Sequence, residues 1–130
     1  MTGETPIRSM TVSVYLLRWT DNPEILLLQR AKAPARGCWF QVTGRLEVAE
    51  SAVAAARREV LEETGLGSVQ LYAANWVEQW FTPEGNAILL APVFVAHVAR
   101  DARVRINAEN RAFRWVTFPE LRRRFSTTLK

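Results

Sequence analysis

The segment from Ser51 to Gly65 constrains the fold of this chain more than any other part of its sequence. Alanines fill the segment, and Val53, Ala56 and Val60 form an apolar stripe at helical spacing. Gly65 stands where a helix commonly ends on a glycine in the left-handed conformation. These features predict an α-helix over residues 51–64.

Segments rich in β-branched and aromatic residues lie on both sides of this helix, and they predict strands. The expected strands cover residues 9–19, 24–30, 69–81, 87–99 and 111–118, with a short extended piece at 38–44 and a second helix starting near residue 118. One strong helix among many strands favours an α/β domain in which helices cover the faces of a mixed sheet.

Length and composition agree with a single folded unit. The chain has 130 residues, of which 48% are hydrophobic and 23% charged, as is usual for a globular domain. We expect a loose N-terminal tail over residues 1–8 and one domain over residues 9–130. No apolar run is long enough to cross a bilayer, and the first ten residues lack a signal-peptide pattern. Cys38 is the only cysteine, so a reducing, cytoplasmic location is expected.

The charge of the chain is unevenly distributed. Its formal net charge is +4, yet residues 44–65 are acidic in balance and residues 100–130 are strongly basic. A basic excess suits nucleic acid, and it equally suits small phosphorylated molecules. Composition by itself leaves these two classes of partner open.

Three carboxylates crowd the second half of the predicted helix. Glu59, Glu62 and Glu63 fall on one face, where like charges repel. Grouped carboxylate oxygens suit Mg²⁺ or Mn²⁺, and a bound cation would relieve the repulsion. The alternative is an acidic helix face that is only solvated, and the three glutamates alone do not decide between the two.

The wider pattern around these glutamates is specific. From Gly44, five residues precede Glu50 and seven more precede Arg58 and Glu59; an aliphatic residue, the Glu62–Glu63 pair and Gly65 complete it. This resembles the Nudix box, GX5EX7REUXEEXGU with U aliphatic, at every defined position. The resemblance implies an α/β/α sandwich of the MutT-like Nudix hydrolases. It also implies hydrolysis of a P–O–P bond in a nucleoside diphosphate derivative, with Mg²⁺ or Mn²⁺ as the cofactor.

The same resemblance assigns roles to the residues of the box. Glu59, Glu62 and Glu63 would be metal ligands, and one of them would also act as the base toward water. Arg58 would orient Glu59 through a salt bridge. The remaining members are expected to be structural: Gly44, which lets the loop approach the helix, Glu50, which braces the loop through Arg58, and Gly65, which ends the helix.

Family enzymes often recruit a further acid from a later loop. Glu109, shortly before the last predicted strand, is the candidate for a fourth metal ligand, with Glu78 and Glu84 as alternatives. The sequence also departs from the common pattern. Many Nudix boxes carry glycine just before the first box glycine and just before the first glutamate, and here those positions hold Thr43 and Ala49.

The segment LLLQRAKAPARGCWFQVTG resembles dihydroneopterin triphosphate pyrophosphatases, which belong to the Nudix family and also accept deoxynucleoside triphosphates. The expected reaction gives a monophosphate and pyrophosphate. Arg30 would meet phosphates, and Trp39 and Trp80 would stack on a base or pterin ring. A general nucleoside triphosphate pyrophosphohydrolase is the nearest alternative, followed by enzymes of dinucleoside polyphosphates, nucleotide sugars or capped RNA.

A different class of function is a Nudix-fold module that binds a nucleotide or RNA without turnover. The intact glutamates favour the enzyme, because a module without catalysis has no physical need for mutually repelling acids. The expected partner is therefore a small phosphorylated substrate rather than nucleic acid or a membrane. Many relatives dimerise, so a homodimer is among the expected assemblies.

Overall fold

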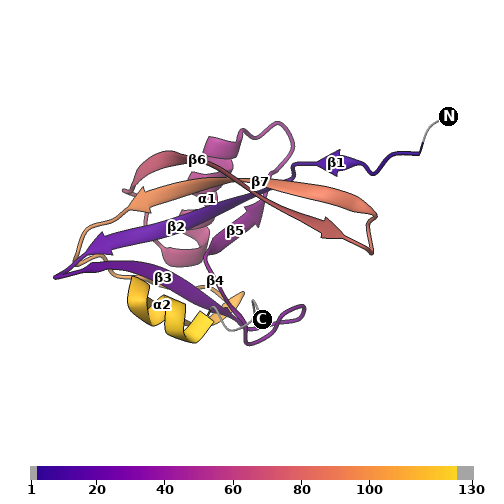
Figure 1. Cartoon of the computed structure of the whole chain (residues 1–130). Coiled ribbons are helices and arrows are strands. Elements are labelled where there is room, and N and C mark those ends of the chain that lie inside the picture. Colours follow the sequence, from indigo (N-terminus) through magenta and orange to yellow (C-terminus); the bar gives the residue numbers. More distant parts are fainter. Residues whose placement is uncertain (1–2, 126–130) are drawn as a thin grey trace.

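The computed structural model describes the backbone of residues 3–125 and the side chains up to residue 122. Figure 1 shows a twisted sheet with a helix packed on it from either side. The elements in chain order are β1 (Ile7–Arg8), β2 (Thr11–Trp19), β3 (Pro23–Arg30), β4 (Trp39–Phe40), β5 (Val42–Arg45), α1 (Ala52–Thr64), β6 (Gln70–Thr82), β7 (Ala87–His97), β8 (Asn110–Thr117) and α2 (Phe118–Phe125).

The sheet is mixed, as predicted. β2 runs parallel to β7 and antiparallel to both β3 and β5. β3 pairs with the carboxyl half of β2 and β5 with its amino half, and each pairs with residues of β2 that β7 also pairs, so both lie on the side of β2 opposite β7. β8 pairs with β3, and β6 pairs with β7 along a long antiparallel hairpin.

Helix α1 has the ends that its sequence predicts. The Ser51 hydroxyl caps the amino end by accepting a hydrogen bond from the Ala54 N–H at 3.1 Å. Gly65 ends the helix with φ of 75°, and its N–H donates to the Leu61 carbonyl at 2.9 Å. The helix packs against β5 and β2, so it lies directly beside the strand that carries the first glycine of the sequence pattern.

Two apolar clusters on opposite faces of the sheet give the three layers. Leu26 and Leu28 of β3 pack in the larger cluster with Val60 of α1. Ile25 and Leu27, their neighbours in the strand, pack in a second cluster with Leu121 of α2. Successive residues of a strand point to opposite faces, so α1 and α2 cover different faces. The α/β/α arrangement expected from the sequence is confirmed.

The structure departs from the expectation in two places. Ile7 and Arg8, expected in a loose tail, form the short strand β1 and pair in parallel with Ile88 and Leu89 of β7. Val53, expected on the buried stripe of α1, is half exposed. Among the described residues, no helix is long and apolar enough to cross a membrane.

Candidate active site

The site begins where β5 passes closest to α1. Gly44 pairs with Val12 of β2, so the sheet holds its backbone in place. A Cβ atom at this position would overlap the carboxyl carbon, Oε1 and Cγ of Glu59. Only a residue without a side chain allows this approach, which gives Gly44 a direct steric role in seating the Glu59 carboxylate.

Arg58 ties three of the acids together. Its Nε and Nη2 donate to the two oxygens of Glu50 at 2.8 and 2.9 Å, a bidentate pair. Its Nη1 donates to Glu59 Oε1 at 2.8 Å and to Glu62 Oε2 at 3.2 Å. Nη2 also donates to the Arg45 carbonyl at 2.8 Å. One guanidinium thus connects the loop before the helix, strand β5 and the acids of the helix.

These contacts shift the pKa values of Glu50 and Arg58. The hydrogen bond from Arg58, together with the Glu47 N–H, lowers the pKa of Glu50 to about 2. The hydrogen bond to Glu50 and the nearby Glu59 carboxylate raise the pKa of Arg58 further above its ordinary value. Both partners of the brace between Arg58 and Glu50 are therefore charged near neutral pH.

Glu59 and Glu63 are buried, at 8% and 5% exposure, whereas the side chain of Glu62 is half exposed. Burial is the main cause that raises the pKa of Glu63 to about 9, and the hydrogen-bonding distance and charge of Glu59 add to it. Asn110 donates to Glu63 Oε1 at 3.3 Å, but Glu63 Oε2 is buried and receives no hydrogen bond from the described residues. An unpartnered buried carboxylate oxygen beside a second carboxylate is costly unless a proton or a cation fills the gap.

The acids fit a hard divalent cation by their chemistry and by this unpartnered oxygen. Their donor atoms are all carboxylate oxygens, the ligands that Mg²⁺ and Mn²⁺ prefer. Within residues 3–122, however, no three acids already stand together at metal-binding distances. Arg58 turns the carboxylates of Glu59 and Glu62 toward itself, so binding of a cation would require Glu62 to reorient from its exposed position.

A loop that follows β7 reaches the same helix. Asn107 Nδ2 donates to the carbonyl of Glu62 at 3.0 Å, and Asn107 Oδ1 accepts from the N–H of Glu109 at 3.0 Å. The Glu109 carbonyl in turn accepts from the N–H of Ala31 at 2.9 Å. The negative charge of Glu109 contributes to the raised pKa of Glu63. The structure therefore brings Glu109 near the acids of α1 while leaving its side chain exposed.

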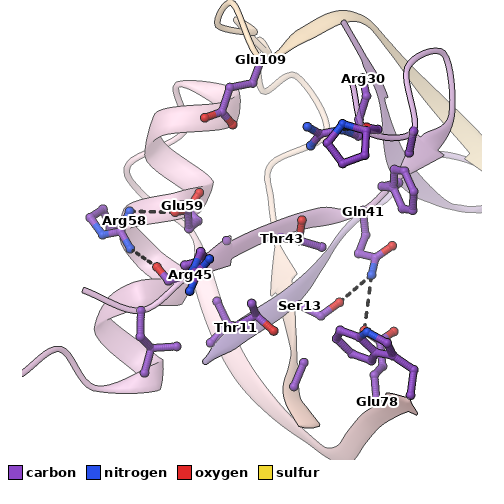
Figure 2. A pocket seen from close by; sticks show the side chains of 18 of the residues that line it. Thr11, Ser13, Arg30, Gln41, Thr43, Arg45, Arg58, Glu59, Glu78 and Glu109 are labelled. Atoms are coloured by element: carbon purple, nitrogen blue, oxygen red, sulfur yellow. Dashed lines mark hydrogen bonds and ion pairs between the residues drawn. The ribbon is translucent and has the colours of Figure 1, made fainter. Parts of the chain in front are cut away.

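A cavity of about 1140 Å³ extends from Glu59 and Glu109 to the surface of the sheet, and Glu62 and Glu63 are not among the residues that line it. Arg58, Glu59 and Glu109 line one part of it, and Gln41 and Glu78 line another (Figure 2). Thr43, a departure from the family pattern, also lines the cavity. Its volume is ample for a nucleotide-sized molecule, since ligand pockets commonly measure about 300–1,000 Å³.

The structure separates the residues expected to bind substrate. Arg30 and Trp80 line the cavity, and Arg30 Nε donates to the Pro34 carbonyl at 3.0 Å. Trp39 does not line it. β4 pairs with β3 so that Trp39 lies opposite Gln29 and packs on the α2 face, and the next residue, Phe40, lines the cavity instead. We therefore leave Trp39 out of the candidate site.

Glu78 and Glu84, the two alternatives to Glu109, differ in their position relative to the cavity. Glu78 lines the cavity, on strand β6. Glu84 is exposed in the turn after β6, accepts a hydrogen bond from the Thr82 hydroxyl at 3.1 Å, and is absent from the cavity wall. Of the three late acids considered, only Glu109 both lines the cavity and contributes to the raised pKa of Glu63.

Sequence reasoning missed a polar network on the sheet wall of the cavity. Gln41 Nε2 donates to Ser13 Oγ at 2.7 Å and to Glu78 Oε1 at 3.5 Å, and the Tyr15 hydroxyl donates to Glu78 Oε2 at 2.6 Å. Burial, followed by Glu78, raises the pKa of Tyr15 above its ordinary value. Alternation along β2 could have put Ser13 and Tyr15 on one face, but no sequence signal joins them to residues 41 and 78.

Ala49 occupies a position where many Nudix boxes have glycine, and its φ is 63°. This left-handed conformation is costly for a residue with a Cβ atom. The loop thus keeps the backbone geometry that glycine normally permits, although the side chain has changed.

Known proteins resemble this chain in sequence and in fold. The sequence profile of the NUDIX domain family matches residues 8–129. An octanoyltransferase of Myxococcus xanthus is 39% identical over 117 residues, which cover 88% of this chain and 32% of that protein. The 8-oxo-dGDP phosphatase NUDT18 of Homo sapiens is 47% identical over 65 residues, 45% of this chain and 20% of that protein. The chain therefore spans a third or less of these relatives.

Among solved structures, the fold is similar to the MutT NUDIX hydrolase of Burkholderia pseudomallei. The TM-score is 0.66 at 26% identity, and the superposition covers 88% of this chain and 87% of the other.

Proposed function

Because the chain belongs to the NUDIX family, we propose that it hydrolyses a diphosphate linkage in a small nucleoside or pterin triphosphate. The reaction would give a monophosphate and pyrophosphate, with Mg²⁺ or Mn²⁺ as the cofactor. The observation that supports the proposal most is the environment of Glu63. This buried carboxylate has one oxygen without a partner among the described residues, lies beside Glu59, and has its pKa raised in part by the negative charge of Glu109.

The acids of α1 would hold the metal ion. Glu59 and Glu63 would supply the buried oxygens, Glu62 would turn in from the surface, and Glu109 would add a ligand from the late loop. When bound, a divalent ion screens the charge of the phosphate oxygens and makes hydroxide available near neutral pH. Glu63 must lose its proton for this role, and its raised pKa makes it the candidate for the group that holds or releases a proton.

Other residues would position these acids and the substrate. Arg58 fixes the orientation of Glu59 through its 2.8 Å hydrogen bond and is itself held by Glu50. Arg30 and Lys32 line the same cavity and carry positive charge toward it, so they suit the phosphates of the substrate. The name of the human relative, 8-oxo-dGDP phosphatase, supports a nucleoside phosphate as the substrate class.

The experiment that tests the proposal is the release of pyrophosphate and phosphate, with and without Mg²⁺. The panel contains dihydroneopterin triphosphate, the deoxynucleoside triphosphates, 8-oxo-dGDP, ADP-ribose and diadenosine tetraphosphate. We expect metal-dependent release of pyrophosphate from a triphosphate. We also expect Glu63→Gln to lower kcat by about a hundredfold or more without unfolding the protein.

Glu84→Gln is the matched control, because Glu84 is an exposed glutamate outside the cavity. Turnover that is independent of metal, or a Glu63→Gln variant as active as the parent, would refute the proposed mechanism. Binding without turnover by the folded parent would instead favour the regulatory module. Dimerisation and a cytoplasmic location stay predictions.

A further inference from the structure

The polar network on the sheet wall of the cavity determines which hydrogen-bonding groups Glu78 and Gln41 can offer to a ligand. Glu78 accepts from the Tyr15 hydroxyl and from Gln41 Nε2. A carboxylate has no hydrogen to donate, so the atom of Gln41 that faces it must be the amide nitrogen. The orientation of the Gln41 amide is thereby fixed by its neighbours (Figure 2).

Both hydrogens of that nitrogen are used, one toward Ser13 and one toward Glu78. Gln41 therefore has no side-chain donor left for a ligand, while within residues 3–122 no donor reaches its amide oxygen. A carboxylate can accept about four hydrogen bonds, and Glu78 accepts two. Glu78 and Gln41 therefore offer the cavity acceptors only.

An aromatic ring adjoins these acceptors. Trp80 stands two residues after Glu78 on β6, so both side chains leave the same face of the strand. Both residues line the cavity, and Trp80 is 44% exposed. An exposed ring next to hydrogen-bond acceptors suits a flat heterocycle that stacks on the ring and presents N–H groups to the acceptors.

We propose that Glu78 and Gln41 bind the N–H edge of a 2-amino-4-oxo heterocycle, that is, a guanine or pterin ring. Such a ring presents two adjacent donors, the ring N–H and the exocyclic amino group, to the acceptor oxygens of Glu78 and Gln41. Adenine and cytosine each present a ring nitrogen that accepts next to their amino group, which would face a carboxylate oxygen without a proton between them. This inference rests on the proposed function, because it assigns the base end of the same triphosphate substrate.

The test compares dGTP with dITP, which has the same ring N–H but lacks the 2-amino group. Binding is measured by quenching of tryptophan fluorescence without Mg²⁺, and kcat/KM is measured with Mg²⁺. We expect dGTP to be favoured over dITP by about tenfold to a hundredfold in both measurements, as for a hydrogen bond to a charged group. Dihydroneopterin triphosphate should behave like dGTP, and dATP like dITP or worse.

The variant Glu78→Gln replaces one acceptor oxygen by a donor, and we expect the preference for dGTP over dITP to fall to about threefold or less. Tyr15→Phe keeps the carboxylate but removes its anchor, so a smaller loss of the same preference is expected. Glu84→Gln, on the same hairpin but outside the cavity, should keep the full preference.

Equal binding of dGTP and dITP by the parent would overturn the inference, and so would a Glu78→Gln variant that keeps the preference. Preferential binding of dGTP without any metal-dependent hydrolysis would instead contradict the proposed function and leave the base assignment standing. The two proposals can therefore fail separately.

Discussion

The substitution Gly44→Ala tests whether the close approach of β5 to α1 creates the metal site. The new methyl carbon would lie closer than 3.0 Å to three atoms of the Glu59 side chain, whereas carbon atoms normally rest about 3.5–4.0 Å apart. The backbone of Gly44 is held in the ladder with Val12. Glu59 must therefore yield by more than about 1 Å, and in doing so it loses its hydrogen bond from Arg58.

A displacement of about 1 Å in a catalytic group typically lowers the rate about a hundredfold. Overpacking in a tight contact costs about 1–3 kcal/mol of stability, which is a minor share of the roughly 5–15 kcal/mol expected for a domain. We therefore expect Gly44→Ala to remain folded and to lose about two orders of magnitude in kcat/KM. The Mg²⁺ concentration needed for half-maximal activity should also rise.

The assay is pyrophosphate release from the best triphosphate over a Mg²⁺ series, with stability measured by urea denaturation. Gly67→Ala is the matched control, because a Cβ at Gly67 would meet only Leu61 Cδ1 at 3.6 Å, an ordinary contact. A Gly44→Ala protein with parental kcat/KM would refute the steric reasoning. Equal losses in both variants would show that the effect is not specific to the site.

Three further predictions follow from the same geometry. Arg58→Lys should lower kcat/KM by about tenfold to a hundredfold, because an ammonium cannot reproduce the bidentate contact with Glu50; Arg57→Lys, measured in parallel, should stay near the parent. Without metal, the free energy of unfolding should fall as pH rises from about 4.5 to about 9, because the raised pKa of Glu63 means that the folded state holds the proton more tightly than the unfolded state. Urea denaturation across this range should show the decline in the free energy of unfolding. Excess Mg²⁺, or the substitution Glu63→Gln, should flatten this pH dependence. Ala49→Gly should raise the free energy of unfolding by about 1 kcal/mol or less, since glycine relieves the positive φ but gives up more chain entropy; a lower urea midpoint would count against a strained loop.

The sequence by itself determined where helix α1 begins and ends. Ser51 and Gly65 mark the ends of α1 through local hydrogen bonds and backbone conformation, and such local signals need no partner from elsewhere in the chain. The three glutamates alone left a metal site and a solvated acidic face open, and it was the resemblance to the Nudix box that predicted metal ligands on this helix. The same resemblance implied a salt bridge between Arg58 and Glu59, which the structure shows at 2.8 Å.

Only the tertiary structure decided which of these glutamates are buried. Helical periodicity put Glu59, Glu62 and Glu63 on one face, but it could not show that Gly44 of β5 makes room for Glu59, that Glu63 is also buried, and that Glu62 stays half exposed. That outcome depends on a contact between separate elements, which local propensity does not encode.

Strand register decided the rest of the cavity. Trp39 and Phe40 are adjacent in sequence, and pairing with β3 sends the first to the α2 face and the second to the cavity. A shift of one residue would place Trp39 opposite Leu28, the position that Phe40 now occupies. In the same way, Gln41 and Glu78 meet only because β2 lies between β5 and β7, with β6 beyond, and no pattern within either segment predicts their contact.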